Sequence, residues 1–407
     1  AIGQSVGVTM LPKPPPTMLA PDRTSKDKDR VHVLETSVVM WTNQIKAVLK
    51  TEPDSVLHQP DDDDGPPGPL KGLEFWEEKA ANLERIIAQL DSESLRKVMR
   101  VLELTKSPYY TAFSALVKEV SIAHAEATDN VRFLQPLKPY FKQLHELDDY
   151  QQLRPLFRPI MHLLLMVWKH SKFYNTPPAL AVLVQEICND LVTQSRKYVD
   201  GSAIFEMEPH EAAAKLSDTI KLCSSFKSIY AEYEKLSQAE CSANQWKLQT
   251  STLFARLDAF LERCYEMLDL CRTVMHFQRL ERVEVGGNKG QELTAQVSSV
   301  FSGFSQELER WKGLGYDVLD TAQAQFKADH DAFRERITQL EQVLGGVLTR
   351  GFDDCSTVSS AFKLIDSFGD LLERDFVQTD IENKHIALIR QYGDDLKDVQ
   401  ELFTANK

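Results

Sequence analysis

The spacing of apolar residues follows the period of an α-helix over most of the chain. Between residues 31 and 50, apolar side chains recur at intervals of four, three, four and three, which places them on one helix face. These side chains are Leu34, Val38, Trp41, Ile45 and Val48. We expect this helix to end near Lys50, because Pro53 follows and the residue before a proline disfavours helical geometry.

The same spacing returns after residue 72 and continues through a series of further helices. Ser92 can cap one of them, Ser107 precedes a proline that suits a first helical turn, and Pro209 opens a long helix. The clearest run covers about three heptads, which fits antiparallel packing in a bundle as well as a short coiled coil. Its members are Leu253, Leu257, Phe260, Cys264, Met267, Cys271 and Val274.

Glycine and proline, the residues that break helices, are unevenly distributed. Gly201 is the only glycine between residues 73 and 285. Because a glycine costs a helix about 1 kcal/mol and a proline about 3 kcal/mol, this stretch is predicted to be mostly helical. Four prolines should divide residues 130–160 into short helices: Pro136, Pro139, Pro155 and Pro159. Later glycines should separate the last helices: Gly286 to Gly290, Gly313 with Gly315, Gly345 with Gly346, and Gly351.

Ten of the 18 prolines lie in the first 70 residues, and this divides the chain into four parts. Residues 1–30 show no apolar period and are predicted to form an extended arm. Residues 31–58 hold the first helix, and residues 59–72 form an acidic linker rich in proline and glycine. Residues 73–407 form a helical-bundle stem, which we expect to continue beyond residue 407. The predicted fold class is all-α, an elongated stack of helical bundles with a small separate N-terminal piece for dimerisation or docking.

The first helix needs a surface to pack on, because a helix of about 20 residues is only marginally stable alone in water. That surface belongs either to the chain's own downstream bundle or to a partner, which is a second copy or another chain. We favour a partner, because Trp41 is the kind of aromatic anchor in which binding energy concentrates. The candidate partner-interface residues are Leu34, Val38, Trp41, Ile45 and Val48.

The composition excludes several classes of protein. With 47 basic and 60 acidic residues, the 407-residue chain has a net charge of −13, which argues against a nucleic-acid partner and against a polybasic membrane anchor. No apolar stretch reaches the roughly 18 residues of a membrane-spanning helix. The six cysteines include no C-x-x-C pair and indicate a reducing compartment. Cys264 and Cys271 lie on the apolar stripe and are interpreted as buried, inert thiols.

Three short segments resemble known functional motifs but lack residues that those motifs require. The cluster from Gly286 to Gly290 lacks the Lys-Ser/Thr pair of a phosphate-binding loop. The aspartates before Gly65 lack the closing glutamate of a calcium loop, and His145 begins a zinc-protease pattern without its second histidine. The sequence therefore predicts no catalytic residue, no cofactor-binding residue, no metal-binding residue and no cofactor in this segment.

Several blocks of sequence, in order and without a large gap between about residues 31 and 402, point to one family. The blocks are Leu73 to Trp76, Ala80 to Leu83, Arg132 to Leu134, Leu153 to Phe157, Trp168 to Thr176, Ile187 to Leu191, Phe277 to Gly290, Gly351 to Cys355, and Ala361 to Leu364. Together they resemble the N-terminal tail region of axonemal dynein heavy chains of the outer-arm type.

The resemblance implies the tail of a microtubule-motor ATPase whose ATP-hydrolysing ring and microtubule-binding stalk lie outside this segment, so that the segment itself is not an enzyme. In that family the tail is a rod of stacked helical bundles that pairs heavy chains and carries intermediate and light chains. It anchors the arm, through a docking complex, on the doublet microtubule of cilia and flagella. The implied location is the axoneme, after assembly in the cytoplasm, with neither nucleic acid nor membrane as a partner.

Two other classes of protein remain open at this stage. One is a rod-like subunit of a membrane-tethering complex, which would also be helical, acidic and non-catalytic. The other is a helical enzyme that uses scattered carboxylates. Such an enzyme requires a deep pocket with convergent acids of shifted pKa, and no spacing in this sequence indicates one.

Overall fold

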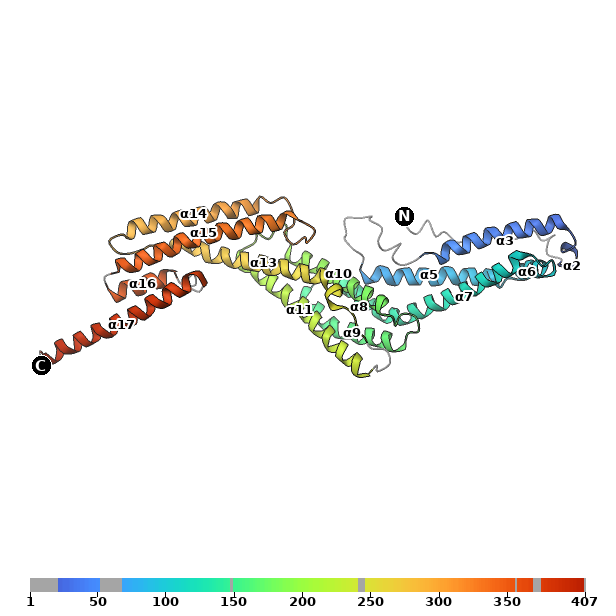
Figure 1. Cartoon of the computed structure of the whole chain (residues 1–407), viewed down its shortest axis with the longest axis horizontal. Coiled ribbons are helices and arrows are strands. Elements are labelled where there is room, and N and C mark those ends of the chain that lie inside the picture. The colour runs from blue at the N-terminus through green and yellow to red at the C-terminus, as the bar shows by residue number, and fades with distance from the viewer. Residues whose placement is uncertain are drawn as a thin grey trace. The chain divides into compact units, whose positions relative to one another are not determined.

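The computed structural model describes residues 21–51, 68–146, 149–240, 246–355, 357–368 and 375–405 (Figure 1). All regular secondary structure within these ranges is α-helix or short 3-10 helix, which confirms the all-α prediction. No helix among these residues is long and apolar enough to pass through a lipid bilayer. The described residues divide into two compact units, one within residues 1–195 and 222–257 and one within residues 196–221 and 258–407.

The first unit contains the helices before and around the middle of the chain. They are α2 (Pro21–Thr24), α3 (Lys28–Leu49), α5 (Pro69–Leu90), α6 (Glu93–Leu104), α7 (Pro108–Leu134), η2 (Gln135–Leu137), α8 (Lys138–Glu146), η3 (Tyr150–Gln152), α9 (Leu153–His170), most of α10 (Pro177–Val199), much of α11 (Pro209–Glu240), and α12 (Thr250–Leu253). Helix α7 packs along α5, and α3 packs against α6 and α7 (Figure 1).

The second unit contains the remaining helices. They are most of α13 (Ala255–Gln278), η4 (Arg279–Arg282), α14 (Gly290–Lys312), α15 (Gln325–Asp354), α16 (Val358–Phe368) and α17 (Asp375–Ala405). Helices α14 and α15 lie side by side (Figure 1). The indole of Trp311 joins them, with its centroid 5.8 Å from that of Phe326 and 5.6 Å from that of Phe333.

The boundaries of the N-terminal parts differ from those predicted. Helix α2 and the start of α3 lie inside the predicted extended arm, where the side chain of Asp27 caps α3 by accepting hydrogen bonds from the amides of Asp29 and Arg30. Helix α5 begins at Pro69, inside the predicted linker. The rest of these two predictions, residues 1–20 and 52–67, lies outside the described residues. The first helix is not a separate piece, because its apolar face packs on α6 and α7 in the first unit.

The local signals for helix starts are confirmed at most positions. The Ser92 hydroxyl accepts a hydrogen bond from the amide of Leu95, and α11 begins at Pro209. The Ser107 hydroxyl instead donates to a carboxylate oxygen of Glu35, 2.6 Å away. Each member of the predicted heptad run is buried. The amphipathic spacing therefore predicted the inward face of this run correctly, although Leu253 lies in α12 and the other members lie in α13.

Three predicted helix breaks are wrong, one at Pro159, one at Gly345 with Gly346, and one at Gly351. Pro159 lies inside α9, where the buried neighbours Phe157, Ile160 and Met161 offset the loss of one backbone hydrogen bond. Helix α15 continues through the glycines at 345, 346 and 351. A β-carbon at Gly351 would lie 3.0 Å from Cδ2 of Leu364, so this glycine allows α16 to pack closely against α15.

Candidate functional site

The apolar stripe on α3 is turned toward the chain's own helices. Leu34, Val38, Trp41 and Ile45 are at most 1% exposed, and Val48 is half-buried. The Trp41 ring lies 6.2 Å from the ring of Phe113 on α7, with the two planes tilted by 50°. The stripe was predicted to pack either on the chain's own bundle or on a partner, and in the structure it packs on the chain's own bundle.

Two polar contacts fix α3 in this position. The hydrogen bond from the Ser107 hydroxyl to Glu35 joins α3 to the start of α7. At the other end, the Lys79 ammonium of α5 donates to the backbone oxygen of Thr51 over 3.0 Å. The four buried side chains therefore offer no exposed apolar surface to a partner while α3 keeps this position.

A different set of side chains on α3 faces solvent. Val33 is 44% exposed, Met40 is 50% exposed, and Val39 lies at the threshold of exposure with 37%. Val33 and Met40 are seven residues apart, so they lie on one side of the helix. The seven-residue spacing of Val33 and Met40 is present in the sequence. It was overlooked because the stripe from Leu34 to Val48 is longer and more regular.

The start of α5 meets two carboxylates from α10. Glu186 and Asp190 are separated by four residues and are both buried. A β-carbon at Gly72 would lie 3.2 Å from Oε2 of Glu186, and one at Gly68 would lie still closer to Asp190. The N-terminus of a helix carries partial positive charge, which favours nearby carboxylates. His145 on α8 also lies near this carboxylate, with its Nδ1 3.5 Å from Oδ1 of Asp190.

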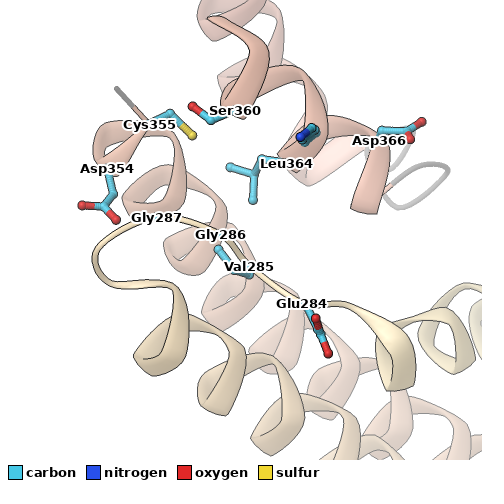
Figure 2. Close-up of a pocket in the computed structure, with 10 residues that line it drawn as sticks. Glu284, Val285, Gly286, Gly287, Asp354, Cys355, Ser360, Leu364 and Asp366 are labelled. Atoms are coloured by element: carbon cyan, nitrogen blue, oxygen red, sulfur yellow. The ribbon is translucent and has the colours of Figure 1, made fainter. Parts of the chain in front are cut away.

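The glycine cluster that resembles a phosphate loop lines a pocket in the second unit (Figure 2). The cavity measures about 470 Å³, and Gly286, Gly287, Asp354 and Leu364 are among the residues that line it. Gly287 has a φ of +100°, a conformation that requires glycine. The amide of Lys289 donates to Oδ2 of Asp354 over 2.8 Å. The anion held at this loop is thus a carboxylate of the chain, whose charge opposes a bound phosphate.

The remaining candidates for a functional site are metal-binding side chains and reactive cysteines. Among the described residues, no group of three or more His, Cys, Asp or Glu side chains is placed to hold a metal ion. Cys264 and Cys271 are both buried, as predicted. Burial raises the pKa of Cys271 to about 12. Because the thiolate is the reactive form, this thiol is inert near neutral pH.

Comparison with known proteins identifies the family of this chain. The family model described as "Dynein heavy chain, N-terminal region 1" matches residues 31–407. The flagellar outer-arm dynein beta chain of Chlamydomonas reinhardtii is 48% identical over 99% of this chain and 9% of its own length. The ciliary dynein beta chain of Heliocidaris crassispina is 32% identical over 98% of this chain and 9% of its own length. Dynein axonemal heavy chain 9 of Homo sapiens is 31% identical over 93% of this chain and 8% of its own length.

These matches define the class of protein as a dynein, and the regular secondary structure of the described residues is helical. The chain belongs to the dynein heavy chain family, and it corresponds to the N-terminal region of the axonemal members. It spans about a tenth of the length of the relatives it matches. Since those relatives are flagellar, ciliary and axonemal, its location is the axoneme. The family assignment decides against a membrane-tethering subunit.

Proposed function

We infer that this segment is a non-catalytic tail part of an axonemal dynein heavy chain. It pairs heavy chains, scaffolds intermediate and light chains, and anchors the arm through a docking complex on the doublet microtubule. ATP hydrolysis belongs to the remainder of the heavy chain, and the segment needs no cofactor. The observation that carries the proposal is the family match over residues 31–407 in a chain whose described residues form packed helices.

The buried stripe has an indirect part in pairing. Leu34, Val38, Trp41 and Ile45 hold α3 on its bundle, and this directs Val33 and Met40 outward. Exposed apolar side chains on a well-anchored helix need little ordering when a partner binds, which favours affinity. The contact residues for a second heavy chain are therefore placed on the outer side of α3, and Val48 lies at its half-buried edge.

Packed helices also suit a mechanical role. A helix holds its length through backbone hydrogen bonds at every residue, and close packing of neighbouring helices resists deformation. In unit one, α5 and α7 pack along each other, and the ion pair from Lys138 to Glu77, 2.7 Å long, ties α8 to α5. Such a segment can keep motors in register and transmit force between subunits.

The test uses the full-length heavy chain with Val33→Glu and Met40→Glu. Placing carboxylates in an apolar contact should weaken heavy-chain pairing by about tenfold or more, measured by co-purification from axonemal extracts and by light scattering. Ile122→Glu is the matched control, because Ile122 is 62% exposed on α7. Unchanged pairing of the double variant would contradict the assignment of this surface.

A further inference from the structure

The solvent-facing side of α3 carries a second regular pattern of side chains. Val33, Thr36, Met40, Asn43 and Ala47 are all exposed. Their spacing is three, four, three and four residues, so they form one stripe along the helix. This is the spacing of the contact positions in a two-helix coiled coil. We call these five residues the α3 seam.

Most of the α3 seam can be covered by another helix at little cost. The seam is turned away from the buried stripe around Trp41, and none of its residues is charged. The Thr36 hydroxyl donates to the backbone oxygen of His32 over 3.0 Å, so its proton already has an acceptor. Four of the five seam side chains therefore leave no hydrogen-bond donor unpaired when a helix packs on them.

Asn43 is the exception within the seam. Its side chain carries two N–H donors and a carbonyl acceptor, and it is exposed to water. An apolar side chain packed over this amide would remove the water without replacing its hydrogen bonds, which weakens binding by about tenfold or more. For this reason a polar residue at a contact position of a coiled coil fixes the register and the choice of partner. Asn43 favours a helix with an amide or hydroxyl at the same level.

The charges beside the α3 seam indicate what else that helix carries. Lys46 and Lys50 are the only charged residues between positions 40 and 50, and both are exposed. They attract carboxylates. A second copy of α3 fits poorly in either direction. A parallel copy in the same register would bring these lysines close to their own equivalents, and an antiparallel copy would place Asn43 opposite Val33 or Met40.

We propose that Asn43 determines which heavy chain binds to the α3 seam. The partner is a helix of a different heavy chain, with a side-chain amide or hydroxyl opposite Asn43 and a carboxylate beside Lys46 or Lys50. This inference rests on the proposed role of α3 in heavy-chain pairing and adds the residue that gives the pairing its selectivity.

The test uses the full-length heavy chain, mixed with the heavy chains of an axonemal extract. The measured quantity is the ratio of the preferred partner to all other heavy chains that co-purify, determined by quantitative mass spectrometry. Asn43→Leu should lower this ratio by about tenfold, whereas Asn43→Gln keeps an amide and should retain about half of the ratio or more. Gln306→Leu, an exposed position on α14, is the matched control and should leave the ratio unchanged.

A ratio that Asn43→Leu leaves unchanged would overturn the proposal, as would an equal loss in Asn43→Gln. Failure of the pairing surface itself gives a different result. If Val33→Glu with Met40→Glu pairs normally, the surface is not used at all. If that double variant pairs poorly while Asn43→Leu keeps the ratio of the natural chain, heavy chains pair through the seam but Asn43 does not select the partner.

Zero-length cross-linking of the same complex tests the predicted carboxylate. A carbodiimide condenses a lysine amine with a carboxylate in contact to form an amide, and the carbodiimide takes up the water as a urea. Lys46 or Lys50 should be joined to an Asp or Glu of the other heavy chain, in a segment with heptad spacing. Lys46→Gln with Lys50→Gln should abolish this product. No cross-link between heavy chains, or one only to a second copy of α3, would overturn the proposal.

Discussion

The backbone at Gly68 approaches Asp190 so closely that a β-carbon at position 68 would overlap Oδ1 of that carboxylate. Gly68 is the N-cap of α5, and Asp190 is buried on α10. The final glycine of the proline-rich stretch is thus a packing residue that lets a carboxylate reach the positive end of α5. Gly72 and Glu186 repeat the relationship one turn later.

Gly68→Ala should therefore destabilise the first unit. The added methyl group overlaps a buried carboxylate, and we expect a loss of about 1–3 kcal/mol in the free energy of unfolding, measured by urea denaturation. Gly346→Ala is the control with the opposite sign. Its β-carbon would meet nothing within 4 Å inside α15, so it should be neutral or stabilise by up to about 1 kcal/mol. A neutral Gly68→Ala would contradict the close approach.

Substitutions at Trp41 should separate the contribution of its volume from that of its indole N–H. Trp41→Ala leaves a cavity beside Phe113 and should cost about 3–5 kcal/mol. The indole N–H is buried without a hydrogen-bond acceptor, so Trp41→Phe removes an unsatisfied donor and should cost about 1.5 kcal/mol or less. Urea denaturation followed by circular dichroism measures both values. Equal losses would indicate that volume is not what Trp41 supplies.

His330 should make the second unit less stable in mild acid. Burial lowers the pKa of His330 below its ordinary value of about 6.5, an effect opposed by Glu266, whose Oε1 is 4.0 Å away, and reinforced by Arg334. The negative charges of Asp331 and Asp269 also act to raise the pKa of His330, and the ring of Phe326 stacks on the imidazole with its centroid 5.5 Å away.

The sign follows from proton binding. The unfolded chain protonates this histidine near pH 6.5, but the folded chain does so only at lower pH. The contribution of neutral His330 to the free energy of unfolding is complete above about pH 7.5. It is lost as the pH falls through 6.5 toward the pKa of His330 in the folded chain. His330→Phe should flatten the dependence of unfolding free energy on pH between 7.5 and 5. The same change at His162, which is exposed, should keep the slope of the natural chain.

Thiol labelling should distinguish the described cysteines. Burial raises the pKa of Cys223 and of Cys271 to about 12, so at pH 8 their thiolate fractions are more than about a thousandfold below that of an ordinary cysteine. Cys355 is half-buried and should react first. In a Cys241→Ser background, Cys355→Ser should abolish the fast phase of reaction with a disulfide reagent. A fast phase that persists would mean that a buried thiol is accessible.

The sequence by itself determined the fold class and most of the helices. Local signals sufficed at Ser92 and Pro209, because a cap hydroxyl and a first-turn proline act on backbone groups within one helical turn. The heptad run from Leu253 to Val274 also gave its buried face correctly, because burying apolar area is the main driving force and amphipathic spacing states which face is buried.

The tertiary structure decided which surfaces these faces meet. The spacing of the stripe around Trp41 would be the same whether Trp41 packs on Phe113 of the same chain or on a second chain. Periodicity shows which face of a helix is apolar, but it does not show what packs on that face. Pro159 and Gly351 are residues typical of helix breaks, yet α9 continues among buried neighbours of Pro159, and α15 continues through Gly351, which lies close to the side chain of Leu364. Such contacts join residues far apart in the chain, and a pattern confined to neighbouring residues does not contain them.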